Sequence, residues 1–391
     1  MPKSSLLIIN KSFPPDQSSS GRLAFDLAHY MAAKGWRVSV LCEGQGATQN
    51  SATNITVIPV KKSTKNNIFS DLVLKFRFIQ ASFKMKHHQY IVTMTDPLDL
   101  ILLKRFFVRK KIQKHIHWVE DLYPEIIEAL ENKNLQKEKT KMLKALKSTD
   151  KIVVTGRDVA NKIRQKNILT NKISYIPNWT ILHGSHLQDF GHQESQALQS
   201  LDHLKKDDSQ KFRIIYAGNL QKEHPIGIMI KAAEILRDHE EIEFLFIGDQ
   251  HAHSRLSKER DKRELSNMRF IPFQPPGHFQ RILETGDVHL VSLRPQVTGL
   301  TVPCKFYASL AVGRPCIFIG SSDSEIGQVI KEFKNGDIVD DMSPETLAKT
   351  ILKYREDGNV WFSAQEGALK ASETFYPDNS LQQWAKLLEA L

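Results

Sequence analysis

Short apolar runs alternate with amphipathic stretches along nearly the whole chain. The short runs predict buried strands, and apolar residues at three- and four-residue spacing between them predict helices. Seven strands are expected in the first half, at Leu6–Asn10, Val38–Glu43, Ile55–Val60, Tyr90–Asp96, His115–Asp121, Ile152–Gly156 and Ile173–Pro177. Six are expected in the second half, at Phe212–Gly218, Phe244–Gly248, Met268–Phe273, Val288–Leu293, Cys316–Gly320 and Asp337–Val339.

Helices are predicted between most of these strands. Their ranges are Gly21–Lys34, Ile68–Lys86, Lys139–Leu146, Arg157–Gln165, Ile226–Arg237, His278–Glu284, Glu325–Lys331, Pro344–Tyr354 and Asn379–Leu388. Alternation of this kind is typical of parallel sheets with right-handed crossover connections. The predicted fold class is therefore α/β, with two Rossmann-like doubly wound domains that face each other across a cleft.

The length of 391 residues exceeds what one core usually supports, so two domains are expected. We assign residues 1–180 to the first domain and 211–372 to the second. The polar segment 181–210 is interpreted as a linker, and 373–391 as a C-terminal helix that packs back on the first domain. Ligands of doubly wound sheets bind at the carboxyl ends of strands. Two such edges facing each other would place a ligand between the domains.

Composition fits an ordinary globular protein, with 41% apolar and 25% charged residues. The chain shows neither a signal-peptide pattern nor an apolar run long enough to span a membrane. Its cysteines, Cys42, Cys304 and Cys316, are spaced for neither zinc nor a disulfide framework. A reducing cytoplasm is the expected compartment.

The net charge of +10 is concentrated in two segments. Residues 61–88 contain seven Lys or Arg and the single acid Asp71, and residues 104–114 contain six and no acid. In the first segment, apolar side chains recur among the lysines at helical spacing, a pattern typical of helices that lie on anionic membranes. A surface helix packed on its sheet explains the same pattern. No nucleic-acid-binding signature accompanies the charge, so no nucleic acid partner is expected.

One candidate phosphate site follows Pro303. Proline is favourable at a helix start, and Gly313 followed by Pro315 predicts a stop. The helix between them would offer free backbone N–H groups and Lys305 in its first turn, which together suit a phosphate. A plain core helix with a solvated lysine is the alternative.

Two other strand exits carry candidate donor-binding residues. Ser20 and Gly21 belong to a loop of small residues after the first strand, which allows close approach of a ligand; a flexible loop is the alternative. This loop lacks both the G-x-G-x-x-G and the P-loop patterns. In the second half, Gly218, Asn219 and Lys222 follow a strand and supply donors for phosphate oxygens, unless they form only a polar turn.

Two carboxylates are candidates for catalysis, and two histidines are candidates for metal binding. Glu120 and Asp121 end a predicted central strand, where successive side chains face opposite ways, so one of them is expected in a site. Asp121, at the exit, is the predicted catalytic residue; a helix N-cap is its alternative role. His251 and His253 lack a third ligand at an interpretable spacing, so we interpret them as solvated loop residues and expect no metal.

Taken together, several motifs give this chain a resemblance to bacterial two-Rossmann-domain (GT-B) glycosyltransferases of retaining family four. Within that family it is similar to enzymes of colanic acid, O-antigen and exopolysaccharide biosynthesis. The resemblance extends over nearly the full length, and rests on Gly21, Asp121–Pro124, Pro177–Trp179, Ala217–Asn219, Pro303–Tyr307 and Gly313–Pro315.

Two features depart from the family pattern. The Glu-x7-Glu pair found in many members is replaced by Leu300 and Ala308. Asn219 and His224 stand where many members have an arginine and a lysine. The departures leave the donor contacts open, and we assign them to Lys305 for the diphosphate and Glu325 for the ribose hydroxyls.

The resemblance implies transfer of a sugar from a nucleotide diphosphate sugar, a UDP-sugar by family frequency, with retention of anomeric configuration and without an essential metal or cofactor. A lipid-linked or polysaccharide acceptor and a peripheral position on the cytoplasmic face of the cell membrane are implied too. A nucleotide-sugar 2-epimerase of the same fold stays open as an alternative. So does a non-catalytic sugar-binding protein on a degenerate scaffold.

Overall fold

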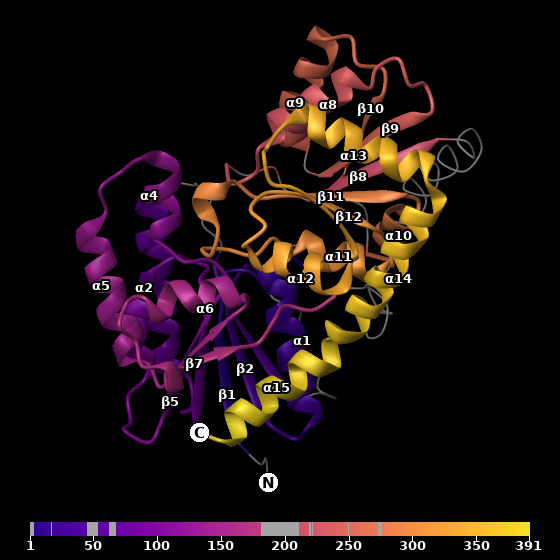
Figure 1. The fold of residues 1–391 in the computed structure, drawn as a ribbon. Coiled ribbons are helices and arrows are strands. Elements are labelled where there is room, and N and C mark those ends of the chain that lie inside the picture. The colour runs from indigo at the N-terminus through magenta and orange to yellow at the C-terminus, as the bar shows by residue number, and fades with distance from the viewer. Residues whose placement is uncertain are drawn as a thin grey trace. The chain divides into compact units, whose positions relative to one another are not determined.

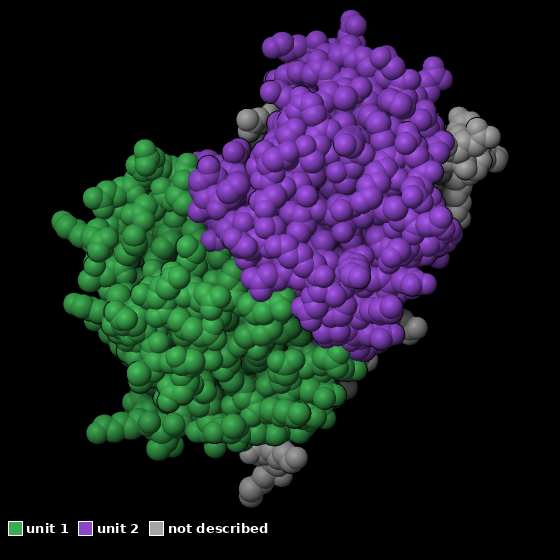
Figure 2. All heavy atoms as spheres, in the orientation of Figure 1, with its two compact units in different colours: residues 1–178, 299–302, 378–391 green, residues 179–298, 303–377 purple. Residues whose placement is uncertain are grey.

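The computed structural model describes residues 4–16, 18–44, 54–61, 68–180, 211–218, 220, 222–248, 250–272 and 276–391. It forms two compact units, shown in different colours in Figure 2. Unit 1 contains Met1–Asn178, Gly299–Val302 and Asp378–Leu391, and unit 2 contains Trp179–Thr298 and Pro303–Pro377. The predicted linker at 181–210 lies outside the described residues.

Unit 1 is built on a parallel sheet of seven strands in the order β3-β2-β1-β4-β5-β6-β7 (Figure 1). The strands are β1 (Ser5–Ile9), β2 (Arg37–Glu43), β3 (Ile55–Val60), β4 (Tyr90–Thr93), β5 (Lys114–Val119), β6 (Lys151–Val154) and β7 (Ile173–Tyr175). The helices are α1 (Ser19–Ala33), α2 (Ile68–Lys84), α3 (Lys104–Phe107), α4 (Glu125–Glu131), α5 (Gln136–Ser148), α6 (Arg157–Arg164) and α15 (Pro377–Glu389).

The C-terminal helix α15 packs within unit 1, far in sequence from the strands that it contacts (Figure 1). Trp384 on this helix is fully buried, and its ring centroid lies 4.7 Å from that of Trp118 on β5. Ser380 Oγ donates a hydrogen bond of 2.9 Å to the carbonyl oxygen of Pro177. Burial of two indoles at one contact makes α15 an integral part of the core of unit 1.

Unit 2 has a parallel sheet of six strands in the order β10-β9-β8-β11-β12-β13. The strands are β8 (Phe212–Ala217), β9 (Ile242–Gly248), β10 (Met268–Pro272), β11 (Val288–Ser292), β12 (Cys316–Ile319) and β13 (Gly336–Val339). The helices are α8 (Ile226–Ile235), α9 (Gln250–Lys262), α10 (Pro276–Glu284), α11 (Lys305–Ala311), α12 (Glu325–Phe333), α13 (Pro344–Glu356) and α14 (Gly358–Thr374).

The central strand β8 is buried on both faces, as its continuous apolar run predicts. Ile214 and Tyr216 face one hydrophobic cluster, whereas Ile215 and Ala217 face another on the opposite side of the sheet. Alternation along the strand therefore fixes which side chains reach the carboxyl edge from each face. Tyr216 is the last residue of β8 on its face.

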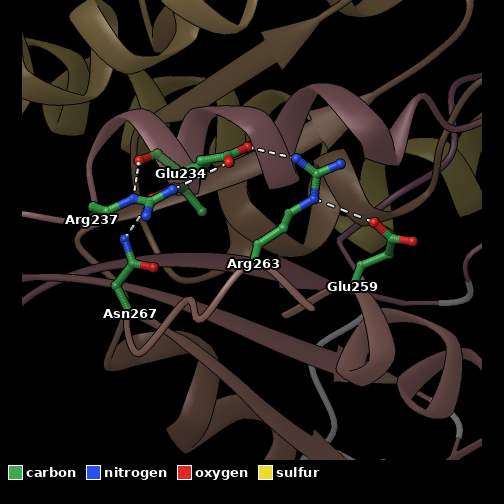
Figure 3. A network of polar contacts seen from close by, with 6 residues as sticks. Glu234, Arg237, Glu259, Arg263 and Asn267 are labelled. Carbon is green, nitrogen blue, oxygen red and sulfur yellow. Dashed lines mark hydrogen bonds and ion pairs between the residues drawn. The ribbon is translucent and has the colours of Figure 1, made fainter. Parts of the chain in front are cut away.

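A network of ion pairs ties the outer helices of unit 2 together (Figure 3). Arg263 donates to Glu234 across 2.6 Å and to Glu259 across 3.3 Å, and the amide of Asn267 donates to the carbonyl oxygen of Ala233. The charged side chains are about one-third exposed. Water screens ion pairs of this exposure, so the network contributes little to the stability of the unit.

The predicted α/β class with two Rossmann-like domains is confirmed, and each strand expected from the sequence is present. Among the described residues, four helices were not expected: α3, α4, α9 and α14. The sequence of α9, QHAHSRLSKERDK, has too few apolar residues to show a helical period. Helix α4 is only seven residues long and directly follows Pro124.

Candidate functional site

The loop after β1 closes on itself through hydrogen bonds. Ser18 is the N-cap of α1, and its Oγ accepts the N–H of Gly21 at 3.0 Å. Ser20 Oγ accepts from the Asn10 amide at 3.3 Å. A Cβ on Gly21 would lie 3.0 Å from the carbonyl carbon of Ser12. Gly21 is therefore required for packing inside this loop, and its N–H group is already hydrogen-bonded to the N-cap Ser18.

Asp121 follows β5 and pairs with a segment from the second half of the sequence. It forms an antiparallel bridge with Thr301, and the N–H of Leu122 donates to the carbonyl oxygen of Leu300 at 2.7 Å. The N–H of Asp121 donates to Thr95 Oγ1 at 3.3 Å. Helix α4 begins only at Glu125, so the alternative N-cap role of Asp121 is wrong.

The neighbouring Glu120, which the sequence does not predict as the catalytic residue, lies in a strongly perturbed environment. One carboxylate oxygen, Oε2, accepts a hydrogen bond of 2.8 Å from the amide of Asn178. The other, Oε1, is buried without a hydrogen-bond partner among the described residues. Burial raises the pKa of Glu120 to about 8, against the opposing effect of the Asn178 hydrogen bond. Glu120 is therefore mainly protonated at neutral pH.

Considering two sequence motifs together could have identified Glu120 as a candidate site residue. Glu120-Asp121 and Pro177-Asn178-Trp179 follow β5 and β7, two parallel strands of one sheet that β6 separates. Parallel strands end at the same edge, so the polar residue of one motif lies within reach of the other.

In unit 2, the amine of Lys305 lies at the carboxyl end of β8. Its Nζ donates a hydrogen bond of 2.6 Å to Tyr216 Oη and lies 3.1 Å from His224 Nε2. Nζ also lies 4.3 Å from the centroid of the Tyr216 ring, a cation–π distance. The structure thus brings Lys305 together with His224, the residue that departs from the family pattern.

The pKa values of this cluster are strongly perturbed. Burial lowers the pKa of Lys305 to about 7, while the charges of Cys304 and Glu223 act in the opposite direction. Burial, followed by the charge of Lys305, lowers the pKa of His224 to about 3. Perturbed groups at a strand exit are typical of functional sites. Within the ranges that the structure describes, no carboxylate forms an ion pair with Lys305.

The helix after Pro303 begins as predicted, at Lys305, but part of its first turn is already hydrogen-bonded. The N–H groups of Phe306 and Tyr307 donate to the carbonyl oxygens of Pro303 and Cys304, both at 3.1 Å. These two donors are therefore occupied, and the expectation that they are free for an anion is corrected. The Lys305 side chain stays a candidate for meeting an anion.

The other residues predicted to bind the donor differ in exposure, and one of them is not described by the structure. Gly218 adopts φ of +126°, and a Cβ there would lie 3.4 Å from Lys305 Cε, so the glycine borders the amine closely. Lys222 is exposed and Glu325 is 1% exposed in the first turn of α12. Asn219 lies outside the described residues.

No group of three potential metal ligands occurs among the described residues. His251 and His253 belong to helix α9, which spans Gln250–Lys262, so their interpretation as loop residues is wrong. The residues of α9 are mainly polar, so the sequence shows no apolar helical period there.

Helix α2 carries apolar side chains on two faces. Leu74 and Phe78 are buried in the core of unit 1. Leu72, Phe76 and Phe83 are 64%, 58% and 59% exposed, at spacings that place them along one stripe.

Cations border this exposed stripe. Arg109 lies over the ring of Phe83, with 5.3 Å from Cζ to the ring centroid. The same loop exposes Lys110 and Lys111, followed by Ile112, which is 76% exposed. We call the side chains of Leu72, Phe76, Phe83, Arg109, Lys110, Lys111 and Ile112 the basic apolar surface. Among the described residues, no helix is both long and apolar enough to cross a bilayer.

Comparison with known families supports the expected resemblance. Residues 202–367 match the model of the family described as glycosyl transferases group 1. Over 212 residues the chain is 28% identical to the putative colanic acid biosynthesis glycosyl transferase WcaI of Escherichia coli K12. That alignment covers 54% of this chain and 50% of the relative, and the chain spans about half the length of the curated relatives it matches.

Solved structures match over the full length. Sucrose-phosphate synthase of Thermosynechococcus elongatus superposes with a TM-score of 0.79, at 13% identity, over 99% of both chains. Anabaena HepE, solved with UDP and glucose, superposes with a TM-score of 0.73, at 14% identity, over 99% of this chain and 100% of that one. The chain therefore has the GT-B fold, and residues 202–367 are similar to the glycosyl transferases group 1 family.

Proposed function

We propose that this protein transfers a sugar from a nucleotide diphosphate sugar to a polysaccharide or lipid-linked acceptor. The observation that carries the proposal is the Lys305 amine, half-buried at the carboxyl end of β8, without a carboxylate ion pair in the described chain. A buried amine of this kind suits an anionic ligand. It lies inside the domain that matches glycosyl transferases group 1.

A UDP-sugar is the proposed donor. Support comes from HepE, which shares the fold and was solved with UDP-glucose. In the reaction, the bond between the anomeric carbon and the diphosphate oxygen breaks, and its electron pair leaves with the nucleotide. The acceptor oxygen forms the new bond to the anomeric carbon, and its proton is released to solvent. We propose that the anomeric configuration of the donor sugar is retained in the product.

Lys305 would stabilise the negative charge that develops on the leaving diphosphate. Electrostatic stabilisation of this type is commonly worth 10²–10³ in rate for one donor. The proposal assigns this charge to protein donors and to no essential metal. Glu325, on the next helix, is proposed for the ribose hydroxyls, and Lys222 for a phosphate oxygen.

Residues of unit 1 are proposed for the acceptor side. Asp121 would accept a hydrogen bond from the acceptor hydroxyl, since its carboxylate follows β5 at the sheet edge. Glu120, held protonated by burial beside Asn178, would then supply a neutral neighbour to Asp121. Ser20 Oγ accepts a hydrogen bond from the Asn10 amide, and Ser20 is proposed only as a secondary contact to the ligand.

We also propose that unit 1 binds an anionic membrane surface through its basic apolar surface. Exposed phenylalanines flanked by cations are the pattern of helices that lie in a lipid interface. A lipid-linked acceptor would be presented from such a surface, on the cytoplasmic face of the membrane.

The experiment is a product analysis with UDP-glucose, UDP-galactose, UDP-N-acetylglucosamine and GDP-mannose. Transfer predicts release of free nucleotide that a polysaccharide or lipid acceptor accelerates, and Lys305→Ala lowers it by about 100-fold or more. Lys349→Ala, an exposed lysine of α13, is the matched control and leaves the rate unchanged. Appearance of an epimeric nucleotide sugar without nucleotide release would favour the 2-epimerase. Binding without any turnover would favour the non-catalytic scaffold.

A further inference from the structure

Among the described residues, hydrogen-bond acceptors and an aromatic ring surround the amine of Lys305, and no counter-charge lies at ion-pair distance. Tyr216 Oη lies 2.6 Å and His224 Nε2 3.1 Å from Nζ. On another side, a Cβ placed on Gly218 would lie 3.8 Å from Nζ. An ammonium has three donors, and these contacts use two of them.

The hydrogen bond between His224 and Ser292 fixes the state of the imidazole. His224 Nδ1 lies 2.7 Å from the carbonyl oxygen of Ser292, which can only accept. Nδ1 therefore carries the proton, and in the neutral ring Nε2 presents a lone pair to Lys305. His224 can orient the amine as a hydrogen-bond acceptor, but it adds no negative charge to the cluster.

Several described segments contribute titratable or charged groups to the cluster of Lys305, Tyr216 and His224. These are Tyr216 from β8, Glu223 and His224 from the loop that follows, Arg294 after β11, and Cys304 directly before α11. The charges of Glu223 and Cys304 favour the ammonium, and that of Arg294 lowers the pKa of His224. Burial outweighs the favourable charges, so the amine is only partly protonated at neutral pH.

We propose that His224 is a positioning residue that directs the Lys305 amine toward the diphosphate, and that Lys305 takes up one proton from solvent when the nucleotide sugar binds. This inference rests on the proposed function, because the diphosphate supplies the missing counter-charge. An anion within a few ångströms favours the charged amine, so binding and protonation are linked. No covalent bond changes in this step; a proton moves from solvent to Nζ.

The linkage has a defined direction. Above about pH 7 the free amine is mainly neutral, and binding has to be accompanied by protonation. The dissociation constant then rises by up to about tenfold per pH unit. Below that pH, Lys305 is already charged and affinity levels off. The two phosphates of a nucleotide sugar stay fully ionised over this range, so the protein is the source of the pH dependence.

The test is calorimetric titration with UDP-glucose at about pH 6 and 8.5, each in two buffers of different ionisation enthalpy. The buffer difference measures protons taken up per ligand bound. We expect nearly one proton at the higher pH and nearly none at the lower. GDP-mannose, dTDP-glucose and CDP-glucose are titrated in the same way, so that the choice of nucleotide does not decide the result.

Three variants separate linkage from a structural effect. Lys305→Arg stays charged throughout, so it should bind with no proton uptake and with an affinity independent of pH. His224→Gln retains a donor for Ser292 and an acceptor for Lys305, and should retain the uptake. His224→Glu places a carboxylate beside the amine, and should abolish the uptake while weakening binding. Thermal melts check that each variant is folded.

The outcomes for the proposed function and for the linkage are distinct. Binding of a nucleotide sugar at about pH 6, with no proton uptake at 8.5, would overturn the linkage and leave the proposed function standing. Absence of binding for all four nucleotide sugars at about pH 6 would overturn both.

Discussion

The side-chain amide of Asn178 donates a hydrogen bond of 2.8 Å to Glu120 Oε2, joining the segment after β7 to the end of β5. The two residues are 58 positions apart in sequence. Their contact leaves the second oxygen of Glu120 buried without a partner among the described residues. A carboxyl group in that position is more stable protonated than charged.

This environment predicts a pH-dependent stability. The pKa of Glu120 rises from 4.5 to about 8 on folding, so its protonation stabilises unit 1 fully below about pH 4.5. That contribution is lost between about pH 4.5 and 8, by up to about 1.4 kcal/mol per pH unit. Glu120→Gln mimics the protonated side chain, and should raise the free energy of unfolding at about pH 8 but not at about pH 5. Urea titrations at both values measure it, and equal stability of the two proteins at pH 8 would contradict the prediction.

The packing of Trp384 against Trp118 predicts a large effect far from the proposed site. Trp384→Ala should lower the free energy of unfolding by about 3–5 kcal/mol, since a fully buried indole is replaced by a cavity. Phe362→Ala, at a ring that is 62% exposed on α14, is the control and should change stability by less than about 0.5 kcal/mol. Denaturant midpoints compare the two, and similar midpoints would show that α15 is not part of the core.

The basic apolar surface predicts membrane binding that depends on particular side chains. Phe76→Asp should reduce binding to vesicles containing phosphatidylserine by about tenfold or more. The variant loses an apolar anchor and gains a negative charge that the anionic lipid repels. Phe362→Asp, equally exposed but in unit 2, should bind as the parent protein does. Vesicle sedimentation measures both, and equal losses in the two variants would remove the surface from the proposal.

The assignment of the diphosphate charge to Lys305 predicts a reaction that tolerates chelation. Excess EDTA should leave nucleotide release within about twofold of the untreated protein, because no metal ion is assigned a role. Loss of activity that added Mg²⁺ restores would show that a metal shares the task.

Much of the fold could be predicted from periodicity, because strands of parallel sheets read as apolar runs. β8, β9 and β12 are buried along their whole length, and their ranges were predicted to within a few residues. Helix α9 was missed for the opposite reason, since its composition is polar. Boundaries also shifted where a turn decided them, as at Ser18, which starts α1 before Gly21.

The candidate site was predictable only in part. Lys305 was found because a proline and a Gly-Arg-Pro stop frame it in the sequence. Its partners were not, since the contact with Tyr216 spans 89 positions and the contact with His224 spans 81. Strand alternation could not separate Glu120 from Asp121, because β5 ends at Val119, before both residues, and the contact of Glu120 with Asn178 spans 58 positions.

The most direct measurement is a calorimetric titration of UDP, GDP, dTDP and CDP at about pH 6, into the parent protein, Lys305→Ala and Lys349→Ala. The account predicts selective binding of one nucleotide at micromolar concentration, weakened by about tenfold or more in Lys305→Ala and unchanged in Lys349→Ala. Equal affinity in the parent and Lys305→Ala, or no binding of any of the four, would contradict it.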